Sequence, residues 1–244
     1  MLTTFVVMSY ELGVMSYELG VMSYERLLSV CLLLLWAGHT EAQTSWRDSL
    51  TVLNREIALS PRSTDLRLKK AAVNIELGQW DYAIDEYGRV LDIDSECLAA
   101  LYFRAYAHTH ENHLDLARRD YEHFLSIVPR HFEARLGLAM VKQKMGRRQE
   151  TFDELTLLVE QHPDSALAYV ARAGFEVEMK QYEAALYDWD KAISLRPDDA
   201  DLVASKVDVL LTMKRNAEAA ATIEEALRRG IPRSALKKWL DLCK

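Results

Sequence analysis

The chain has 244 residues, with 30 lysines and arginines against 37 aspartates and glutamates and a formal net charge of −7. This excess of acid is mild and the two signs are interspersed, which argues against a basic nucleic-acid-binding face. The three cysteines form no paired motif of the kind that holds a metal ion or a small disulfide framework.

Residues 7–28 contain nearly the same seven residues three times, VMSYELGVMSYELGVMSYERLL. The apolar residues have the spacing of a coiled coil. Gly13 and Gly20 recur in the copies, however, and each glycine costs a helix interior roughly 1 kcal/mol relative to alanine. The heptads therefore predict at most a weak coiled coil. We interpret residues 1–21 as a duplicated coding segment upstream of the true start.

An apolar stretch from Leu27 to Gly38 follows the heptads. It is too short to span a bilayer core, which needs about 20 helical residues. Thr40 and Ala42 are small residues of the kind that a signal peptidase needs before its cleavage site. A start at Met22 also leaves a slightly positive leader, as is typical of secretory signals. We therefore predict that residues 22–42 form a signal peptide.

Such a leader predicts an exported protein. The periplasm or cell envelope of a bacterium is the preferred location, and secretion from the cell is the alternative. The pattern leaves the organism class and the true start codon open. We expect no membrane span in the mature chain.

Proline recurs at a fixed spacing along the rest of the chain. Pro61, Pro129, Pro163 and Pro197 are 34 or 68 residues apart, and Ser95 takes the remaining position. Proline ends helices, and a period of this size indicates a solenoid of repeated helical units. Other columns with the same spacing keep their character. The small column is Ala71, Ala105, Ala139, Ala173 and Val207, and a large column is Tyr87, Tyr121, Leu155, Trp189 and Ile223.

Each period contains two helical segments with an apolar spacing near 3.6 residues, joined by a short turn. Gly78, Asn112 and Gly146 are residue types that accept a positive φ where the first helix stops and the chain reverses. A single helix pair cannot bury enough apolar surface to stand alone, so neighbouring pairs must stack. The sequence thus predicts an all-α solenoid of stacked antiparallel helix pairs.

Three segments, LGQWDYAIDEYGRVLDIDS, LDLARRDYEHFLSIVPRH and KQYEAALYDWDKAISLRPDD, resemble tetratricopeptide repeats. The small, aromatic, aliphatic and proline columns match that family in register from about residue 44 to 233. The resemblance implies a right-handed superhelix with an N-terminal half repeat, five full repeats and a C-terminal capping helix. The expected bounds are 43–63 for the half repeat, 64–97, 98–131, 132–165, 166–199 and 200–233 for the five repeats (64–233), and 234–244 for the capping helix.

Proteins of this family are typically binding scaffolds, whose first helices line a concave groove for a partner's peptide. The resemblance therefore implies a non-catalytic protein-protein interaction scaffold with an unidentified protein or peptide partner. The residues show no catalytic set and no phosphate-binding glycine loop, so we expect no catalytic residue and no cofactor. The segment HTHENH at 108–113 suggests a metal site, but its histidines fall in columns that do not easily converge on one ion, so we expect none. Tyrosine suits such a groove because its rigid ring buries area at low entropy cost. The expected partner-binding residues are Tyr102, Tyr106, His110, Met140, Gln143, Lys144 and Glu178.

Several alternatives remain at this level. Tyr102 or Tyr106 could pack against the next repeat instead of a partner. The best understood peptide clamp of the family uses lysine and arginine, and Leu68 and Ala72 supply no such cation here. A different class of function is a small enzyme or metal-handling protein built on a helical array, which would need a deep polar pocket with strongly shifted ionisable groups. The oligomeric state stays open.

Overall fold

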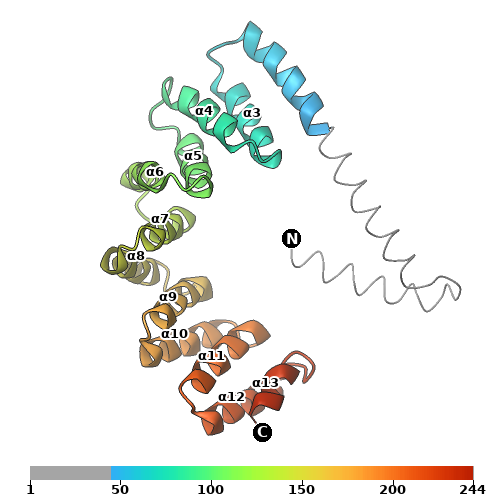
Figure 1. Ribbon diagram of the computed structural model, residues 1–244, viewed down its shortest axis with the longest axis vertical. Helices are drawn as coiled ribbons and strands as arrows, with labels where there is room; N and C mark the ends of the chain where they lie inside the picture. The colour runs from blue at the N-terminus through green and yellow to red at the C-terminus, as the bar shows by residue number, and fades with distance from the viewer. Residues whose placement is uncertain (1–44, 244) are drawn as a thin grey trace, which may run out of the picture.

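The computed structural model describes residues 45–243, and every regular element within them is a helix (Figure 1). The predicted duplication and signal peptide, residues 1–42, lie outside the described residues. The first described helix spans residues 45–59. The later helices are α3 (Thr64–Glu76), α4 (Trp80–Leu91), α5 (Leu98–His110), α6 (Leu114–Ile127), α7 (Phe132–Lys144), α8 (Arg148–Gln161), α9 (Ala166–Glu178), α10 (Tyr182–Leu195), α11 (Ala200–Thr212), α12 (Asn216–Arg228) and α13 (Lys237–Leu242).

Proline sets where α6, α8 and α10 end. Val128, His162 and Arg196 each precede a proline and have left the helical region, with φ of −124°, −134° and −133°. The proline ring clashes with the residue before it in the helical conformation, so the helix stops there. Where Ser95 replaces proline, α4 is 12 residues long instead of 14. The turn after α4 is closed differently, because the Asp94 carboxylate accepts the backbone N–H two residues later.

The turns inside the helix pairs have positive φ at one residue each. Gly78, Asn112 and Gly146 have φ of 69°, 60° and 73°, so the prediction for these three positions is confirmed. Lys180 and Lys214 occupy the same place in the next two pairs, at φ of 60° and 61°. A side chain with Cβ is strained in this region of backbone conformation. The lysines in these two turns therefore lower the stability of the fold relative to glycine at the same positions.

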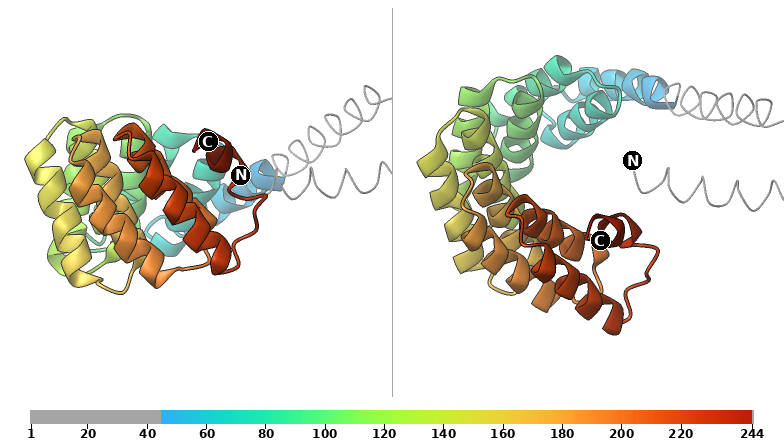
Figure 2. Two further views of the ribbon diagram at one scale, coloured as in Figure 1. Left: turned by 90° about the horizontal axis from the view of Figure 1, so that it is seen from below. Right: turned by 60° about the horizontal axis from the view of Figure 1, so that its bottom comes forward.

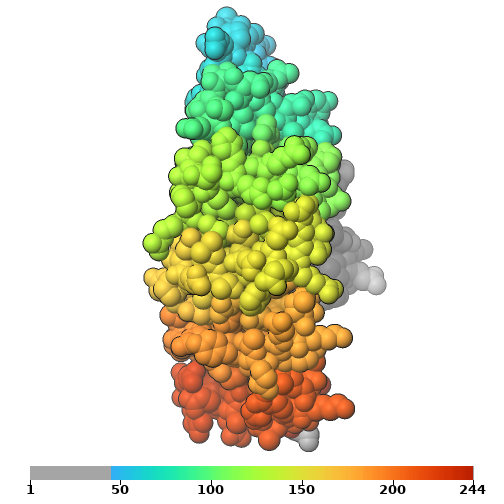
Figure 3. All heavy atoms as spheres, turned by 90° about the vertical axis from the view of Figure 1, so that its left-hand side faces the viewer, coloured from blue at the N-terminus to red at the C-terminus, as the bar shows by residue number. Residues whose placement is uncertain are grey.

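The helix pairs follow one another along an open arc, and each helix packs chiefly against the helices before and after it in the chain. In Figure 1, α5 and α7 lie on the inner side of the arc, and their partners α6 and α8 lie on the outer side. Figure 3 shows the outer surface, where the pairs form successive layers from one end of the molecule to the other. The predicted all-α solenoid of stacked helix pairs is confirmed.

The repeating columns form the core of the array. The small column (Ala71, Ala105, Ala139, Ala173, Val207) is at most 1% exposed, and the large column (Tyr87, Tyr121, Leu155, Trp189, Ile223) is at most 7% exposed. Small side chains let neighbouring helices approach closely, and the large ones fill the space between them. The periodic pattern of the sequence is thus the packing pattern of the core.

Ion pairs also lie inside the helix pairs, which the apolar pattern did not indicate. Arg104 donates two hydrogen bonds to Asp120, both at 2.7 Å, and Arg172 donates two to Asp188, at 2.6 and 2.8 Å. Asp120 and Asp188 are buried, so each needs its arginine to avoid an unpaired charge in the core. Glu86 and Glu154 hold the same acid position in two other pairs, where they accept hydrogen bonds from Arg67 and Arg135, which lie three residues earlier in the repeat than Arg104 and Arg172.

None of the described helices is both long and apolar enough to cross a membrane. Cys97, which precedes α5, and Cys243, which follows α13, are free thiols. α13 packs on α11 and α12 at the C-terminal end of the array.

Candidate partner-binding face

The inner side of the arc is open, and its surface comes from one face of each first helix (Figure 2). We call the exposed side chains of α3, α5, α7, α9 and α11 the concave face. Of the seven residues expected to bind a partner, six lie exposed on this face. They are Tyr106, His110, Met140, Gln143, Lys144 and Glu178.

Tyr102 differs from the other six because it is half-buried. Its ring meets the rings of Tyr121 and Phe124 edge-on, with both centroids 5.9 Å away, and lies 6.0 Å from His131. These contacts join α5 to α6 and to the start of α7. Burial raises the pKa of the Tyr102 hydroxyl. Tyr102 therefore packs within the array, in line with the alternative given above.

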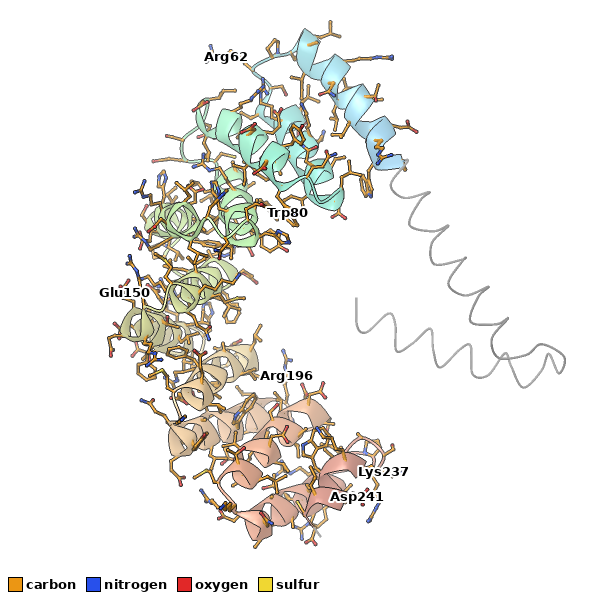
Figure 4. The ribbon with its side chains drawn as sticks, in the orientation of Figure 1. Arg62, Trp80, Glu150, Arg196, Lys237 and Asp241 are labelled. Carbon is orange, nitrogen blue, oxygen red and sulfur yellow. The ribbon has the colours of Figure 1, made fainter. Side chains whose placement is uncertain are left out.

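An aromatic cluster lies where α4 begins and α5 ends. The Trp80 ring stacks on the His110 ring, with centroids 3.8 Å apart and planes 19° apart. The Tyr106 ring meets Trp80 edge-on, with centroids 5.9 Å apart. Figure 4 labels Trp80 on the inner side of the arc. The aromatic cluster of Trp80, Tyr106 and His110 thus brings two expected residues together on the concave face.

Trp80 is the functional candidate that the sequence reasoning did not select. It is the first residue of α4, a second helix, whereas the expected groove residues all came from first helices. The available signal was an aromatic column at the start of the second helices, which contains Trp80 and Tyr182. Its contact with α5 depends on how two consecutive helix pairs stack, and no local pattern predicts that.

Two polar contacts tie neighbouring inner helices together on the concave face. Lys144 Nζ donates to the carbonyl oxygen of Thr109, 3.5 Å away, and so links α7 to α5. Gln143 Nε2 donates to Glu178 Oε2 and links α7 to α9. Met140 is 51% exposed on the same face of α7. The structure therefore brings together the expected residues of three consecutive helix pairs.

Comparison with known proteins identifies the repeat. The sequence model of the tetratricopeptide repeat matches residues 133–165, which cover α8 and all of α7 except its first residue. A solved tetratricopeptide repeat protein from Parabacteroides merdae is 21% identical, over 83% of this chain and 79% of that one, with a TM-score of 0.57. The chain contains a tetratricopeptide repeat, and its array has the fold of tetratricopeptide repeat proteins.

Two further proteins are similar to this tetratricopeptide repeat chain. The solved structure of YrrB, described as having an unusual peptide-binding site, is 15% identical over 72% of this chain and 91% of that one, with a TM-score of 0.56. A DnaJ homolog subfamily C member 7 homolog from Dictyostelium discoideum is 23% identical over 69% of this chain. The similarity spans 40% of that relative's length.

A row of buried polar side chains runs through the first four helix pairs, one per pair, and consists of Asn74, His108, Lys142 and Glu176. Lys142 donates to the carboxylate of Glu154 at 3.0 Å. Asn74 Nδ2, His108 Nδ1 and Glu176 Oε2 are buried and have no hydrogen-bond partner. These three groups carry an unrelieved desolvation cost.

Two members of this row have shifted pKa values. Burial and the nearby Asp188 carboxylate raise the pKa of Glu176 to about 7, although Arg172 acts in the opposite direction. Burial lowers the pKa of His108. These groups lie in the core, not on the concave face, so they bear on stability and not on partner binding.

The histidine-rich segment 108–113 spreads its rings apart. His108 is buried, His110 stacks on Trp80, and His113 lies 5.6 Å from His108 between ring centroids at the start of α6. No group of metal-binding side chains converges anywhere in residues 45–243.

Proposed function

We propose that this protein is a non-catalytic interaction scaffold that holds a segment of a partner protein on its concave face. The repeat family and the fold support a scaffold. The similarity to YrrB, whose description names a peptide-binding site, supports a peptide as the ligand.

The observation that carries this proposal is the exposure of large apolar side chains on consecutive inner helices. Tyr106 is 46% exposed on α5, and Met140 is 51% exposed on α7. Lys144 lies one turn after Met140 on α7, so a hydrogen-bond donor accompanies this apolar area. Rigid aromatic rings beside polar groups are typical of the residues that dominate binding energy at interfaces.

The test compares two exposed tyrosines on opposite sides of the arc. Tyr106→Ala removes a ring from inner helix α5, and Tyr82→Ala removes one from outer helix α4, where Tyr82 is 65% exposed. We expect affinity capture from envelope extracts to lose its specific partners with Tyr106→Ala and to keep them with Tyr82→Ala, at equal helicity by circular dichroism. Equal capture by both variants would contradict a role for the concave face.

We also propose that the protein is exported to the periplasm or cell envelope. The support is the apolar leader described above, followed by small residues before Gln43. N-terminal sequencing of the natural protein should begin at Gln43, and an N-terminus at Met1 would refute export by this leader.

A further inference from the structure

We propose that the concave face selects a cationic partner segment, whose lysine or arginine side chains bind between the exposed carboxylates and the aromatic cluster. This inference rests on the proposed function, because it names the chemistry of the partner that the same face would hold.

The concave face carries an excess of exposed acid. Its first helices expose two lysines, Lys69 and Lys144, and six carboxylates. Inner helices α9 and α11 expose carboxylates and no lysine or arginine. A surface lined by one sign of charge raises the local concentration of partners of the opposite sign. The six carboxylates are Asp65, Glu76, Glu133, Glu178, Asp201 and Asp208.

The outer helices are also acidic, with ten exposed carboxylates, but their charges are mixed. Unlike α9 and α11, each outer helix exposes one basic side chain among its acids. These basic residues are Arg89, Arg119, Arg148, Lys191 and Arg228.

Both lysines of the concave face are already engaged. Lys69 forms a 2.7 Å ion pair with Asp65 one turn away. Lys144 reaches the Thr109 carbonyl in the last turn of α5, where the helix dipole favours a cation. Glu76, at the end of α3, has no such partner among the described residues. The face thus offers a free carboxylate without a free competing cation.

The aromatic cluster supplies a second element of cation recognition. Trp80 begins α4, four residues after Glu76 and across the turn from α3, and its ring is held in place by the stack with His110 and the edge of Tyr106. A lysine or arginine placed over an aromatic face gains about 0.5–2 kcal/mol, and tryptophan is the best acceptor. A carboxylate and such a ring on the same face together favour a cationic side chain over a neutral one.

Asp208 shows that a carboxylate on this face accepts a donor from another segment. The Trp239 side chain of α13 donates its indole N–H to Asp208 Oδ1 at 2.7 Å. Asp208 holds the place on α11 that Tyr106 and Met140 hold on α5 and α7, three and two periods of 34 residues earlier. A donor-rich segment therefore suits this column of the face.

The experiment uses the full chain and three fluorescein-labelled peptides, in which arginine, glutamine or glutamate alternates with alanine. Two variants change the net charge equally. Glu76→Lys reverses a charge in the last turn of α3 on the concave face, and Glu160→Lys reverses one in the last turn of the outer helix α8. Both glutamates are exposed, so neither substitution alters the core.

We expect the arginine peptide to bind more tightly than the other two. Glu76→Lys should weaken binding of the arginine peptide about five- to tenfold, because one exposed ion pair is lost and one repulsion is added. Glu160→Lys should weaken the same binding by less than about twofold. Trp80→Leu should weaken it about threefold or more and leave the glutamine peptide unaffected. Rising salt should weaken binding of the arginine peptide most.

Two results would overturn the inference. Equal loss in Glu76→Lys and Glu160→Lys would show that the peptide responds only to net charge. The preference for cations would be refuted if the glutamine or glutamate peptide bound more tightly than the arginine peptide. If Tyr106→Ala abolished that binding, the concave face would still be the binding site. The proposed function itself fails separately, when Tyr106→Ala retains all natural partners.

Discussion

Gly137 gives the sharpest test of how the array is packed. It lies in the middle of α7, and a Cβ built on it would be 2.6 Å from Cζ and 2.8 Å from Oη of Tyr121. Carbon atoms pack best at about 3.5–4.0 Å, so the Tyr121 ring would have to move by roughly 1 Å in Gly137→Ala. The ring is 3% exposed and touches Tyr102, so it has little room to move.

The net effect is the difference between two opposing contributions. Alanine should gain about 0.5–1 kcal/mol of helix stability over glycine. Overpacking a closed core typically costs about 1–3 kcal/mol. We therefore expect Gly137→Ala to lower the free energy of unfolding by about 1 kcal/mol. Gly174 is the matched control in the middle of α9, where a Cβ would meet nothing within 4 Å, so Gly174→Ala should gain about 0.5–1 kcal/mol.

Thermal melting followed by circular dichroism measures both variants. For a chain of this size, about 1 kcal/mol corresponds to roughly 2–4 °C. A repair variant adds Tyr121→Leu to Gly137→Ala, because the next period carries Leu155 and Ala171 at the same two places. The double variant should lose less stability than the sum of the losses of Gly137→Ala and Tyr121→Leu alone, which is a favourable coupling energy. Equal stabilisation by Gly137→Ala and Gly174→Ala would refute the close packing of Tyr121 on α7.

Two further predictions concern the turns and the buried acid. Lys180→Gly should raise the free energy of unfolding by about 1 kcal/mol in urea titrations, because it relieves a positive φ, and Gly146→Ala should lower it by a similar amount. In the folded protein the pKa of Glu176 is about 7, above its ordinary value of 4.5. The protonated side chain therefore makes its full contribution to the free energy of unfolding below pH 4.5, and this contribution is lost as the pH rises through 7. Between pH 5 and 8 the wild type should lose stability on the order of 3 kcal/mol or less, whereas Glu176→Gln should be nearly flat across this window. A wild type as stable at pH 8 as at pH 5 would show that Glu176 is already paired in solution.

Part of the concave face could be predicted from the sequence. Tyr106, Met140 and Lys144 follow from the resemblance to the tetratricopeptide repeat, whose groove-lining columns carry over onto these positions of the first helices. Trp80 could not be predicted in the same way, because it reaches the face from a second helix. The link between Gln143 and Glu178 joins residues 35 apart, and it forms only after two helix pairs have stacked.

The sequence alone determined the period, the helix pairs and the turns of this protein. These features depend on local chemistry: proline excludes the helical conformation before it, glycine and asparagine accept a positive φ, and small and large residues alternate with the helix pitch. The tertiary structure decided which polar groups meet. The apolar pattern of the sequence did not indicate that Arg172 pairs with Asp188. They meet inside the array because burial removes Asp188 from water, and only a partner at hydrogen-bond distance offsets that cost.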